Sequence, residues 1–588
     1  MNNIHIAILD TYVDLKNNLF KNKVKYAIPG KESQIINSNH ATSMCGEIIA
    51  NCSNVKIDVY PIFENNFSTG AANILQTLSL ISDQKDNNYD IIMLSLGFDG
   101  SDYAIELSDI CKKLYAKGIV IVSAFNNHGG LSYPACLDSV IGIDTSPMIL
   151  DPNSFYIIKK SPINVVCSSR PRAVIQPGGK KALMAGTSIC TAYITGIVAQ
   201  IMLRGKKKLK EILAALEEMA AKEFEDINYA PLSNPYKKGM KYAIFPYSKE
   251  IETIATLCEY SDLQLIDIYD FNKSINIGKT ISSSQNTFQV KGSGSISWDN
   301  FDLLVIGHFD KYISLSARIE KEIDNIILQA ISKRKYIYCF DNLLYKKLEK
   351  YDKKFIPNIT SNDIPRYRNS RLWECPIPII SVIGTGPKQG KFSTQIKLMQ
   401  KFISDGYKVG SISTEPYGYL FDMDYIFPYG YNANIEVPFK DYASILNEWV
   451  YNLYKQENDV ILTALQSGIL PRNYSRKEED LCRQFSVLFG LNPDVAVLCV
   501  YPNDDIFFIK RSIIYINAVF QINIIPILVY PYKYWISDSG KECKENISST
   551  SEYQTQLGVL EKQFPNSVFE MNEKGYEGIY QYILNGLQ

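Results

Sequence analysis

The segment Gly186–Gly196 carries a serine where a helix is expected to begin. A small-residue turn, Gly186-Thr187, precedes Ser188, and small side chains recur along the residues after it. At a helix start, unpaired backbone N–H groups and the positive end of the helix dipole stabilise a developing oxyanion. A serine hydroxyl alone is a poor nucleophile, so nucleophilic catalysis here requires an oriented base from another part of the chain.

A base and a carboxylate that could orient it occur near the N-terminus. The chain has four histidines, and His40 lies at the start of a predicted helix, Asn39–Ala50. Upstream, the apolar pattern of Ile4–Leu9 predicts a buried strand that ends in Asp10. Carboxyl ends of parallel strands are where open α/β sheets place their chemistry. We therefore expect Asp10, His40 and Ser188 to meet.

Residues 1 to about 222 resemble a subtilisin-like serine peptidase domain. The order Asp10, His40, Ser188 is the order found in subtilisin. Five ordered blocks carry the resemblance: Ile8–Thr11, His40–Gly46, Met93–Gly97, Val120–Asn126 with Tyr133-Pro134-Ala135 following, and Gly186–Ser188.

The resemblance implies a role for each of these residues. Ser188 would attack the carbonyl, His40 would take and return its proton, and Asp10 would hold the imidazole tautomer. The Asn126 amide and the Ser188 backbone N–H would stabilise the oxyanion. Proteolysis of this kind needs no cofactor and no metal ion. The substrate-binding residues implied are Ser95, Leu96, Gly97, Ser123, Ala124 and Phe125.

Each candidate also has a purely structural interpretation. Asp10 and Ser188 are residue types that cap helices, and His40 is compatible with a helix histidine whose hydrogen bonds are satisfied. Asn126 is compatible with a turn, in which case Asn127 would be the oxyanion donor. The peptidase interpretation is favoured because the structural one needs a coincidence at every position.

Phe125 replaces a glycine that, in this family, helps to wall the primary specificity pocket. A phenyl ring there would take space from a substrate side chain, so we hypothesise cleavage after a small residue such as Gly or Ala. The alternative is that the ring turns away into the core.

Composition excludes several other classes of protein. With 61 basic and 62 acidic residues, the formal charge is −1, which gives no electrostatic footprint for nucleic acid. The basic run Arg204–Lys210 is interpreted as a solvated helix face. Twelve cysteines lack CxxC pairs and lie partly in apolar contexts, which is typical of reduced thiols in a cytosol. Because Asp10 lies so near the start, neither a signal peptide nor a pro-domain is expected, and no apolar run reaches about 18 residues. We expect a cytoplasmic protein without a membrane span.

Alternating strand and helix signals predict the α/β class throughout. The first domain, residues 1–222, has predicted strands near 4–9, 55–61, 90–95, 118–124 and 139–144, and Leu209–Lys222 is its predicted last helix. A linker at 223–238 precedes a Rossmann-like or flavodoxin-like unit at 239–370, in which residues 274–298 are expected to be a mobile loop. Residues 371–588 are predicted to be a P-loop NTPase-like domain.

The P-loop prediction rests on a buried strand that runs into a glycine-rich loop and then a helix, Phe392–Asp405. Backbone N–H groups of such a loop cradle phosphates, and Lys391 would reach the β/γ-phosphates. The expected ligand is ATP or GTP with magnesium. The predicted nucleotide-binding residues are Gly384, Thr385, Gly386, Gln389, Gly390, Lys391 and Ser393.

The loop departs from the GxxxxGK[ST] pattern in two respects. Its spacing is one residue longer, which resembles the P-loops of dethiobiotin-synthetase-like enzymes. Phe392 stands at the usual Ser/Thr magnesium position, where Ser393 or Thr394 would substitute if the register slipped. Possible acidic partners and a Walker-B-like strand with its switch are Glu415, Asp422, Asp424, Asp459 and Gln466-Ser467-Gly468. The alternative is a phosphate loop retained only as scaffold.

Residues from about 239 to 588 also resemble the P-loop "peptide maturation system" proteins found beside ribosomally made peptide natural products in clostridia-like bacteria. The stretches that carry this resemblance are Tyr247–Glu250, Ile383–Lys391, Gly410–Glu415 and Gln466–Gly468. It implies a ribosomal precursor peptide as substrate and peptide-modifying enzymes as partners.

Three functions therefore remain open at the level of sequence. The first is an intracellular endopeptidase that removes the leader from a precursor peptide, with the P-loop half binding nucleotide, precursor or a partner. The second is a regulatory protease that nucleotide binding switches on. The third is an ATP-dependent peptide-modifying enzyme whose protease domain only recognises the peptide.

Overall fold

The computed structural model divides the chain into two compact units. The first unit comprises Met1–Tyr229 and Pro365–Pro376, and the second comprises Ala230–Ile364 and Ile377–Gln588. The structure describes the chain except for residues 1–2, 29–39, 64–68, 85–88, 99–102, 127–131, 147–148, 159–163, 222–235, 237, 309–316, 342–343, 349, 366–371, 431–434, 472–476, 537–541 and 588. The predicted linker, 223–238, lies almost entirely outside the described residues.

The first unit is built on an eight-stranded sheet with the order β2-β3-β1-β4-β5-β6-β8-β7. All neighbours are parallel except β7 and β8. The strands are β1 (Ile4–Asp10), β2 (Val24–Tyr26), β3 (Val55–Pro61), β4 (Ile91–Leu94), β5 (Val120–Ala124), β6 (Val140–Ser146), β7 (Phe155–Ile157) and β8 (Val165–Ser168). The five strands predicted for this region are therefore all present.

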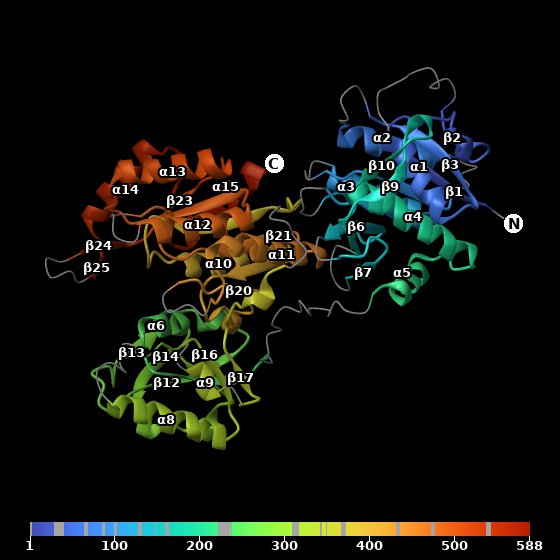
Figure 1. Ribbon diagram of the computed structural model, residues 1–588. Helices are drawn as coiled ribbons and strands as arrows, with labels where there is room; N and C mark the ends of the chain where they lie inside the picture. Colours follow the sequence, from blue (N-terminus) through green and yellow to red (C-terminus); the bar gives the residue numbers. More distant parts are fainter. Residues whose placement is uncertain are drawn as a thin grey trace. The chain divides into compact units, whose positions relative to one another are not determined.

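Helices cover both faces of this sheet (Figure 1). Alternate strand residues, such as Ile6 and Ile8, share one core with α1, α4 and α5. Helices α2 and α3 are not part of that core and contact each other. The helix α4 is apolar all round, as expected of a helix buried in the middle of a domain. The helices are α1 (His40–Asn51), α2 (Ala71–Asp83), α3 (Ala104–Ala116), α4 (Thr187–Leu203) and α5 (Leu209–Met219), and β9 (Arg172–Ile175) pairs with β10 (Lys181–Met184) in a small ribbon.

The strand order places a switch point between β1 and β4. The chain passes from β1 to β3 on one side and later returns to β4 on the other side. In open α/β sheets, ligands bind outside the carboxyl ends of strands at such a point. The register aligns Leu9 with Leu94 and Leu94 with Ser123, so the residues that follow these strands lie side by side at one edge.

The second unit contains a mostly parallel seven-stranded sheet with the order β13-β14-β12-β11-β15-β16-β17. Its strands are β11 (Lys241–Phe245), β12 (Gln264–Asp270), β13 (Thr280–Ser282), β14 (Thr287–Gly292), β15 (Leu303–Ile306), β16 (Tyr336–Cys339) and β17 (Lys354–Phe355), and its helices are α6 (Lys249–Thr256), α8 (Ala317–Ser332) and α9 (Tyr345–Leu348).

The expectation of a mobile loop at 274–298 is wrong. Strands β13 and β14 form an antiparallel pair within it, and β14 also pairs in parallel with β12, so the segment extends the sheet edge. Its Ser, Gly and Asn content resembles a loop. However, Ile281 and Val290 are buried, and this burial holds the hairpin in place.

The second sheet of this unit is fully parallel, with the order β20-β19-β21-β18-β22-β23-β26. Its strands are β18 (Ile379–Gly384), β19 (Val409–Ser413), β20 (Tyr425–Ile426), β21 (Val460–Ala464), β22 (Val495–Val500), β23 (Ile527–Val529) and β26 (Val568–Glu570). The helices are α10 (Lys391–Ser404), α11 (Tyr442–Lys455), α12 (Lys477–Leu491), α13 (Ile506–Phe520), α14 (Ser551–Gln563) and α15 (Glu573–Leu587), and β24 (Tyr532–Ile536) pairs with β25 (Glu542–Asn546).

One hydrophobic core joins the two sheets of the second unit. It includes Tyr242 and Ile254 from the first sheet and its helix, and Val382 and Phe392 from the P-loop sheet and its helix. The α/β prediction with parallel sheets is confirmed. The predicted division at residue 370 stays a prediction, although residues 365–376 group with the first unit.

Candidate active site

Asp10 ends β1 and is completely buried. Its Oδ1 accepts a hydrogen bond from the Thr11 N–H (2.6 Å), and its Oδ2 accepts one from the Ser95 hydroxyl. Burial acts to raise the pKa of Asp10. The charge of His40 and hydrogen bonds from His40, Ser95 and Thr11 outweigh burial and hold the pKa below its ordinary value. Asp10 is therefore a buried carboxylate kept in its charged form.

His40 begins α1, and Thr11 fixes that helix start. The Thr11 hydroxyl oxygen accepts the Ala41 N–H at 3.0 Å, so the residue after Asp10 also caps the helix that carries the histidine. His40 Nδ1 lies 2.8 and 2.9 Å from the two Asp10 oxygens. Burial acts to lower the pKa of His40, but the charge and hydrogen bond of Asp10 raise it above its ordinary value.

This pairing determines which nitrogen of His40 can act as a base. Two carboxylate oxygens next to Nδ1 favour the tautomer with the proton on Nδ1, because a carboxylate can only accept. The lone pair of Nε2 is then available to take a proton from a nucleophile. The side chain of His40 is 24% exposed, so solvent or a substrate can reach it.

Ser188 is the second residue of α4 and follows Gly186, whose φ of 125° only glycine adopts without strain. The Ser188 hydroxyl donates to the Ser95 carbonyl oxygen at 2.8 Å. Ser95 thus contacts Asp10 through its hydroxyl and Ser188 through its carbonyl. The structure brings all three predicted residues to the same strand ends. Turning the Ser188 hydroxyl from Ser95 towards His40 would activate it.

Residues Ser95–Phe98 continue β4 beyond the sheet. The Leu96 carbonyl accepts from the Ser123 hydroxyl (3.3 Å), and Phe98 pairs with Tyr133 through both its N–H and its C=O (3.1 and 2.8 Å). In an extended segment, successive residues direct their backbone groups to opposite sides. Ser95 and Gly97 therefore face the opposite side, which is the side of Ser188. An extended peptide can add there as a further strand.

The predicted oxyanion donor, Asn126, follows β5 and is half-buried. Its backbone N–H donates to the Ser132 hydroxyl oxygen at 3.0 Å. The competing candidate, Asn127, lies outside the described residues. The side-chain amide of Asn126 as oxyanion donor stays a prediction.

The substrate segments approach one another closely. A Cβ on Gly97 would lie 2.7 Å from both the Ala124 carbonyl oxygen and the Ser132 hydroxyl oxygen, so no larger residue fits at 97. Phe125 is 1% exposed, and its ring lies against Gly142 of β6. The ring is thus an interior side chain rather than the solvent-lined wall of an open pocket. The preference for a small residue before the cut stays a prediction, supported by the close approach at Gly97.

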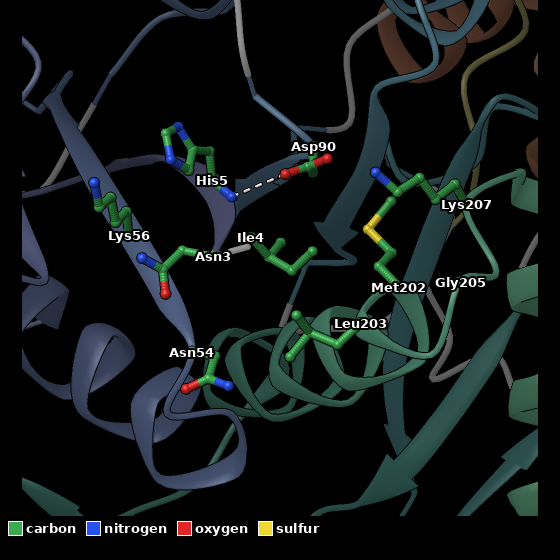
Figure 2. Close-up of a pocket in the computed structure, with 10 residues that line it drawn as sticks. All are labelled: Asn3, Ile4, His5, Asn54, Lys56, Asp90, Met202, Leu203, Gly205 and Lys207. Atoms are coloured by element: carbon green, nitrogen blue, oxygen red, sulfur yellow. Dashed lines mark hydrogen bonds between the residues drawn. The ribbon is translucent and has the colours of Figure 1, made fainter. Parts of the chain in front are cut away.

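A hollow of about 900 Å³ lies at the opposite ends of these strands. Figure 2 shows it between the start of β1, with Ile4 and His5, and the end of α4, with Met202. The Asp90 carboxylate accepts the His5 N–H at 3.0 Å on one side. Because Asp10 ends the strand that Ile4 begins, this hollow is separate from the candidate active site.

In the second unit, β18 leads into the glycine-rich loop, and α10 begins at Lys391. The Gln389 side chain lies inside this loop. Its Oε1 accepts the Gly386 N–H (2.9 Å), and its Nε2 donates to the Thr385 hydroxyl (2.7 Å). The Lys391 ammonium donates to the Gly386 carbonyl at 2.8 Å. A phosphate that uses the Gly386 N–H would have to displace the Gln389 amide.

Burial shifts the pKa of one base and one acid near the loop, Lys391 and Glu415. Burial lowers the pKa of Lys391 to about 8, although Cys499 and Glu415 oppose this shift. Burial raises the pKa of Glu415 to about 7, against the opposing charge of Lys391. Glu415 is thus the one of the predicted acidic partners that interacts electrostatically with Lys391.

The other predicted acids bind backbone groups. Asp424 accepts from the N–H and hydroxyl of Ser411 (both 2.8 Å), and Asp459 accepts the Lys408 N–H (2.7 Å). Asp422 is an exposed residue that ends a 3₁₀ turn. These contacts tie Asp424 and Asp459 to β19 and its start, which is a structural role.

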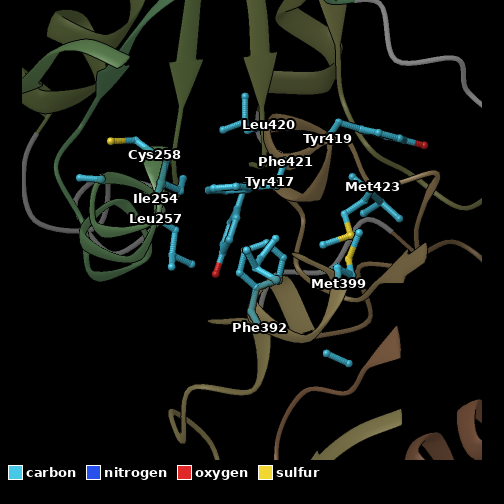
Figure 3. Close-up of a cluster of buried hydrophobic side chains, with 14 of the residues drawn as sticks. Ile254, Leu257, Cys258, Phe392, Met399, Tyr417, Tyr419, Leu420, Phe421 and Met423 are labelled. Atoms are coloured by element: carbon cyan, nitrogen blue, oxygen red, sulfur yellow. The ribbon is translucent and has the colours of Figure 1, made fainter. Parts of the chain in front are cut away.

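Phe392 keeps the position that the motif gives to a magnesium-binding Ser or Thr, and neither Ser393 nor Thr394 replaces it there. Figure 3 shows its ring within an apolar cluster that also contains Ile254 of α6 and Leu257, the residue after that helix. Its centroid lies 5.1 Å from that of Tyr417 and 5.3 Å from that of Phe421, both edge-on. The helix begins at Lys391, so the register does not slip, and the Thr394 hydroxyl donates to the Gly390 carbonyl (2.9 Å). Ser393, the remaining predicted residue, is half-buried on the same turn.

One residue near the loop, Asp504, was missed in the sequence. Asp504 accepts from the Thr385 hydroxyl and from the Tyr501 N–H (2.9 Å). A Cβ on Gly468 would lie 2.7 Å from the Thr385 carbonyl, so the predicted switch segment does meet the loop. The available signal for Asp504 was its position shortly after β22, the strand beside β18.

Two family models match separate parts of the chain. A family model described as "Subtilase family" matches residues 1–152, which include Asp10, His40 and Asn126. The N-terminal part of the chain is a subtilase domain. Residues 366–516 match the model described as "Domain of unknown function (DUF1611_C) P-loop domain". The subtilase and P-loop predictions are therefore confirmed.

Individual relatives extend the first match. Subtilisin DY of Bacillus licheniformis is 26% identical over 214 residues, which span 34% of this chain and 77% of that protein. An intracellular serine protease of Paenibacillus polymyxa is 30% identical over 135 residues, which span 22% of this chain and 40% of that protein. The subtilase domain is accordingly that of a serine endopeptidase.

Solved structures similar to this chain include a lanthipeptide protease and a maturation protease. A lanthipeptide protease matches with a TM-score of 0.32 and 16% identity, covering 38% of this chain and 81% of that one. The prenylagaramide maturation protease PagA matches with a TM-score of 0.29 and 18% identity, covering 35% and 79%. Among the described residues, no cluster of three or more His, Cys, Asp or Glu side chains could hold a metal ion, and no helix is long and apolar enough to span a bilayer.

Proposed function

We propose that the subtilase domain cleaves peptide bonds through Ser188, His40 and Asp10. The observation that carries this proposal is the pair of contacts made by Ser95, whose hydroxyl donates to Asp10 while its carbonyl accepts from Ser188. Together with the contact of Asp10 to His40 Nδ1, these bonds connect nucleophile, base and carboxylate at one sheet edge. These contacts support the roles of nucleophile, base and orienting carboxylate that acyl transfer requires.

The reaction follows from this geometry. His40 Nε2 takes the Ser188 proton as the serine oxygen bonds to the carbonyl carbon, and the imidazolium formed is stabilised by Asp10. The oxyanion lies at the start of α4, where backbone N–H groups and the helix dipole favour negative charge. The Asn126 amide is the second donor. His40 then returns the proton to the leaving amine, and water hydrolyses the acyl-enzyme.

The proposed substrate is a ribosomally made precursor peptide that loses its leader in the cytoplasm. Support comes from the resemblance of the second unit to peptide maturation system proteins. A small residue before the cut is proposed, and the close packing at Gly97, where a Cβ would lie 2.7 Å from the Ala124 carbonyl oxygen and the Ser132 hydroxyl oxygen, supports it. Joining both units in one chain raises the local concentration of any substrate that the second unit holds.

For the P-loop domain we propose nucleotide binding without assigning hydrolysis to it. The loop geometry offers the Gly386 N–H and the Lys391 ammonium to a phosphate once the Gln389 side chain moves away. Phe392 stands at the usual magnesium position and has no hydroxyl, and its ring belongs to the core. The residues present fit a phosphate group better than they fit the usual magnesium site.

A fluorophosphonate probe tests the peptidase proposal directly. The wild-type protein should be labelled at Ser188, and Ser188→Ala should not be labelled. The same two proteins are then incubated with candidate precursor peptides, and products are identified by mass spectrometry. Absence of labelling in a folded wild-type protein would remove the catalytic proposal. Labelling lost in Lys391→Ala would favour a protease switched by nucleotide.

A further inference from the structure

A tryptophan from far along the sequence belongs to the subtilase unit. Trp373 lies in the segment Pro365–Pro376, which follows the first sheet of the second unit in sequence but groups with the first unit. Its side chain is only 1% exposed. The indole N–H donates to the Tyr133 hydroxyl at 3.1 Å, across 240 positions of sequence. A fully buried indole with its N–H satisfied is a specific anchor.

Tyr133 connects this anchor to the substrate strand. It is completely buried and pairs through its N–H and C=O with Phe98, and the centroids of the two rings lie 6.0 Å apart. Phe98 directly follows Ser95–Gly97, the segment whose free side faces Ser188. Any displacement of Tyr133 therefore moves the end of the strand on which an extended peptide would pair.

The residue before Tyr133 contacts the segment that follows β5. This residue, Ser132, accepts the Asn126 N–H and lies beside Gly97. The short segment Ser132-Tyr133 thus contacts both chain segments between which a substrate would lie. Trp373 donates to this segment from outside the contiguous subtilase sequence.

We propose that Trp373 is a positioning residue for substrate recognition, so that residues 372–376 are a working part of the protease cleft. Its burial leaves almost no surface for direct contact with a peptide, so it acts through Tyr133 and Phe98. Ser95 marks the reacting end, and Phe98 lies three residues further on, roughly 10 Å along an extended strand. The affected substrate residues are those three or four positions from the scissile bond on the strand-paired side.

A purely structural role for Trp373 predicts a different result. If Trp373 only stabilised the fold, its loss would lower every activity of Ser188 by the same factor. If it positions the strand, small substrates that never reach Phe98 keep their rate, while long peptides lose affinity. The ratio of the two rates separates the cases.

The experiment compares full-length wild-type protein with Trp373→Ala, Trp373→Phe and Tyr133→Phe. Trp449→Phe serves as the matched control, because Trp449 stacks on Tyr425 in the second unit at 4.9 Å. Three rates are measured: fluorophosphonate labelling, hydrolysis of a single-residue ester, and turnover of the best eight-residue peptide from a library screened on wild type.

In Trp373→Ala, labelling and ester hydrolysis should stay within twofold, while kcat/KM for the long peptide falls at least tenfold through KM. Trp373→Phe removes the indole N–H and narrows the ring, and Tyr133→Phe removes only the hydroxyl. Each should lower kcat/KM for the long peptide two- to fivefold. They keep the test decisive if the alanine variant does not fold. The control should not change.

Equal losses on ester and peptide, or an unchanged ratio in all variants, would overturn the inference. It rests on the proposed peptidase chemistry, and the two can fail separately. An unlabelled wild type would sink the proposed function, whereas normal labelling with unchanged peptide preference would sink only the role of Trp373.

Discussion

Replacing Asp10 by asparagine should lower the reactivity of Ser188 by about 10⁴. Both Asp10 oxygens lie within 2.9 Å of His40 Nδ1 and can only accept, so they keep the proton on that nitrogen. An asparagine amide can present an N–H instead, which favours the opposite tautomer and leaves Nε2 unable to take a proton. At 1.36 kcal/mol per tenfold change in rate, the loss corresponds to about 5 kcal/mol of transition-state stabilisation.

The pH dependence of the same variant gives an independent readout. The charge of Asp10 raises the pKa of His40 above 6.5, while burial acts to lower it. Wild-type labelling should therefore decrease as the pH falls through the raised pKa of His40, because protonated His40 cannot accept a proton. Without the carboxylate only the effect of burial remains, so in Asp10→Asn the decrease should move to lower pH.

The assay is the rate of fluorophosphonate labelling as a function of pH. Asp14→Asn is the matched control, because Asp14 is a nearby carboxylate that accepts from the Lys16 and Gly178 N–H groups and not from His40. It should leave both the rate and its pH profile unchanged. An Asp10→Asn protein that labels at the wild-type rate, or whose acid limb moves to higher pH, would refute the assignment of Asp10 as the partner of His40.

Three further predictions concern packing and the phosphate loop. Gly142→Ala should destabilise the subtilase unit by about 1–3 kcal/mol in urea unfolding, because the new Cβ would lie 2.4 Å from the Ala135 carbonyl oxygen; no change in the midpoint would contradict this. Phe392→Ser should cost about 3–5 kcal/mol by emptying an aromatic cluster, and a gain of magnesium-dependent ATP hydrolysis would show that the ring position was misjudged. In titration calorimetry, Lys391→Ala should abolish ATP binding while Ser188 labelling persists, and wild-type affinity should weaken as the pH rises through about 8, where Lys391 loses its charge.

The parts of the fold that sequence predicts well are those encoded by local patterns. The apolar run Ile4–Leu9 leads into an aspartate, and the apolar run before Gly384–Lys391 leads into glycines and a lysine. In α/β sheets such residues follow the carboxyl ends of buried strands. Strand ends could therefore be located, and the residues on them could be assigned chemistry before any contact was known.

The parts that sequence did not predict depend on contacts across long separations. The hairpin of β13 and β14 reads as a loop because two buried side chains, Ile281 and Val290, hold an otherwise polar segment. The Gln389 amide fills the phosphate loop through bonds that a motif cannot encode. Trp373 belongs to the first unit, although 240 positions of sequence separate it from its hydrogen-bond partner there, Tyr133.

Ser95 explains why these distant contacts bear on catalysis. One residue carries both bonds, its hydroxyl to Asp10 and its carbonyl to Ser188, so a shift of its backbone changes the charge network and the nucleophile together. The backbone of Ser95 continues to Gly97, which has no room to move towards Ala124 or Ser132, and then to Phe98, which Tyr133 holds in place. Rigidity at the far end of this strand is thereby transmitted to the reacting end. A peptide that pairs along the whole strand leaves the Ser95 hydroxyl on Asp10, while Ser188 turns from the Ser95 carbonyl towards His40.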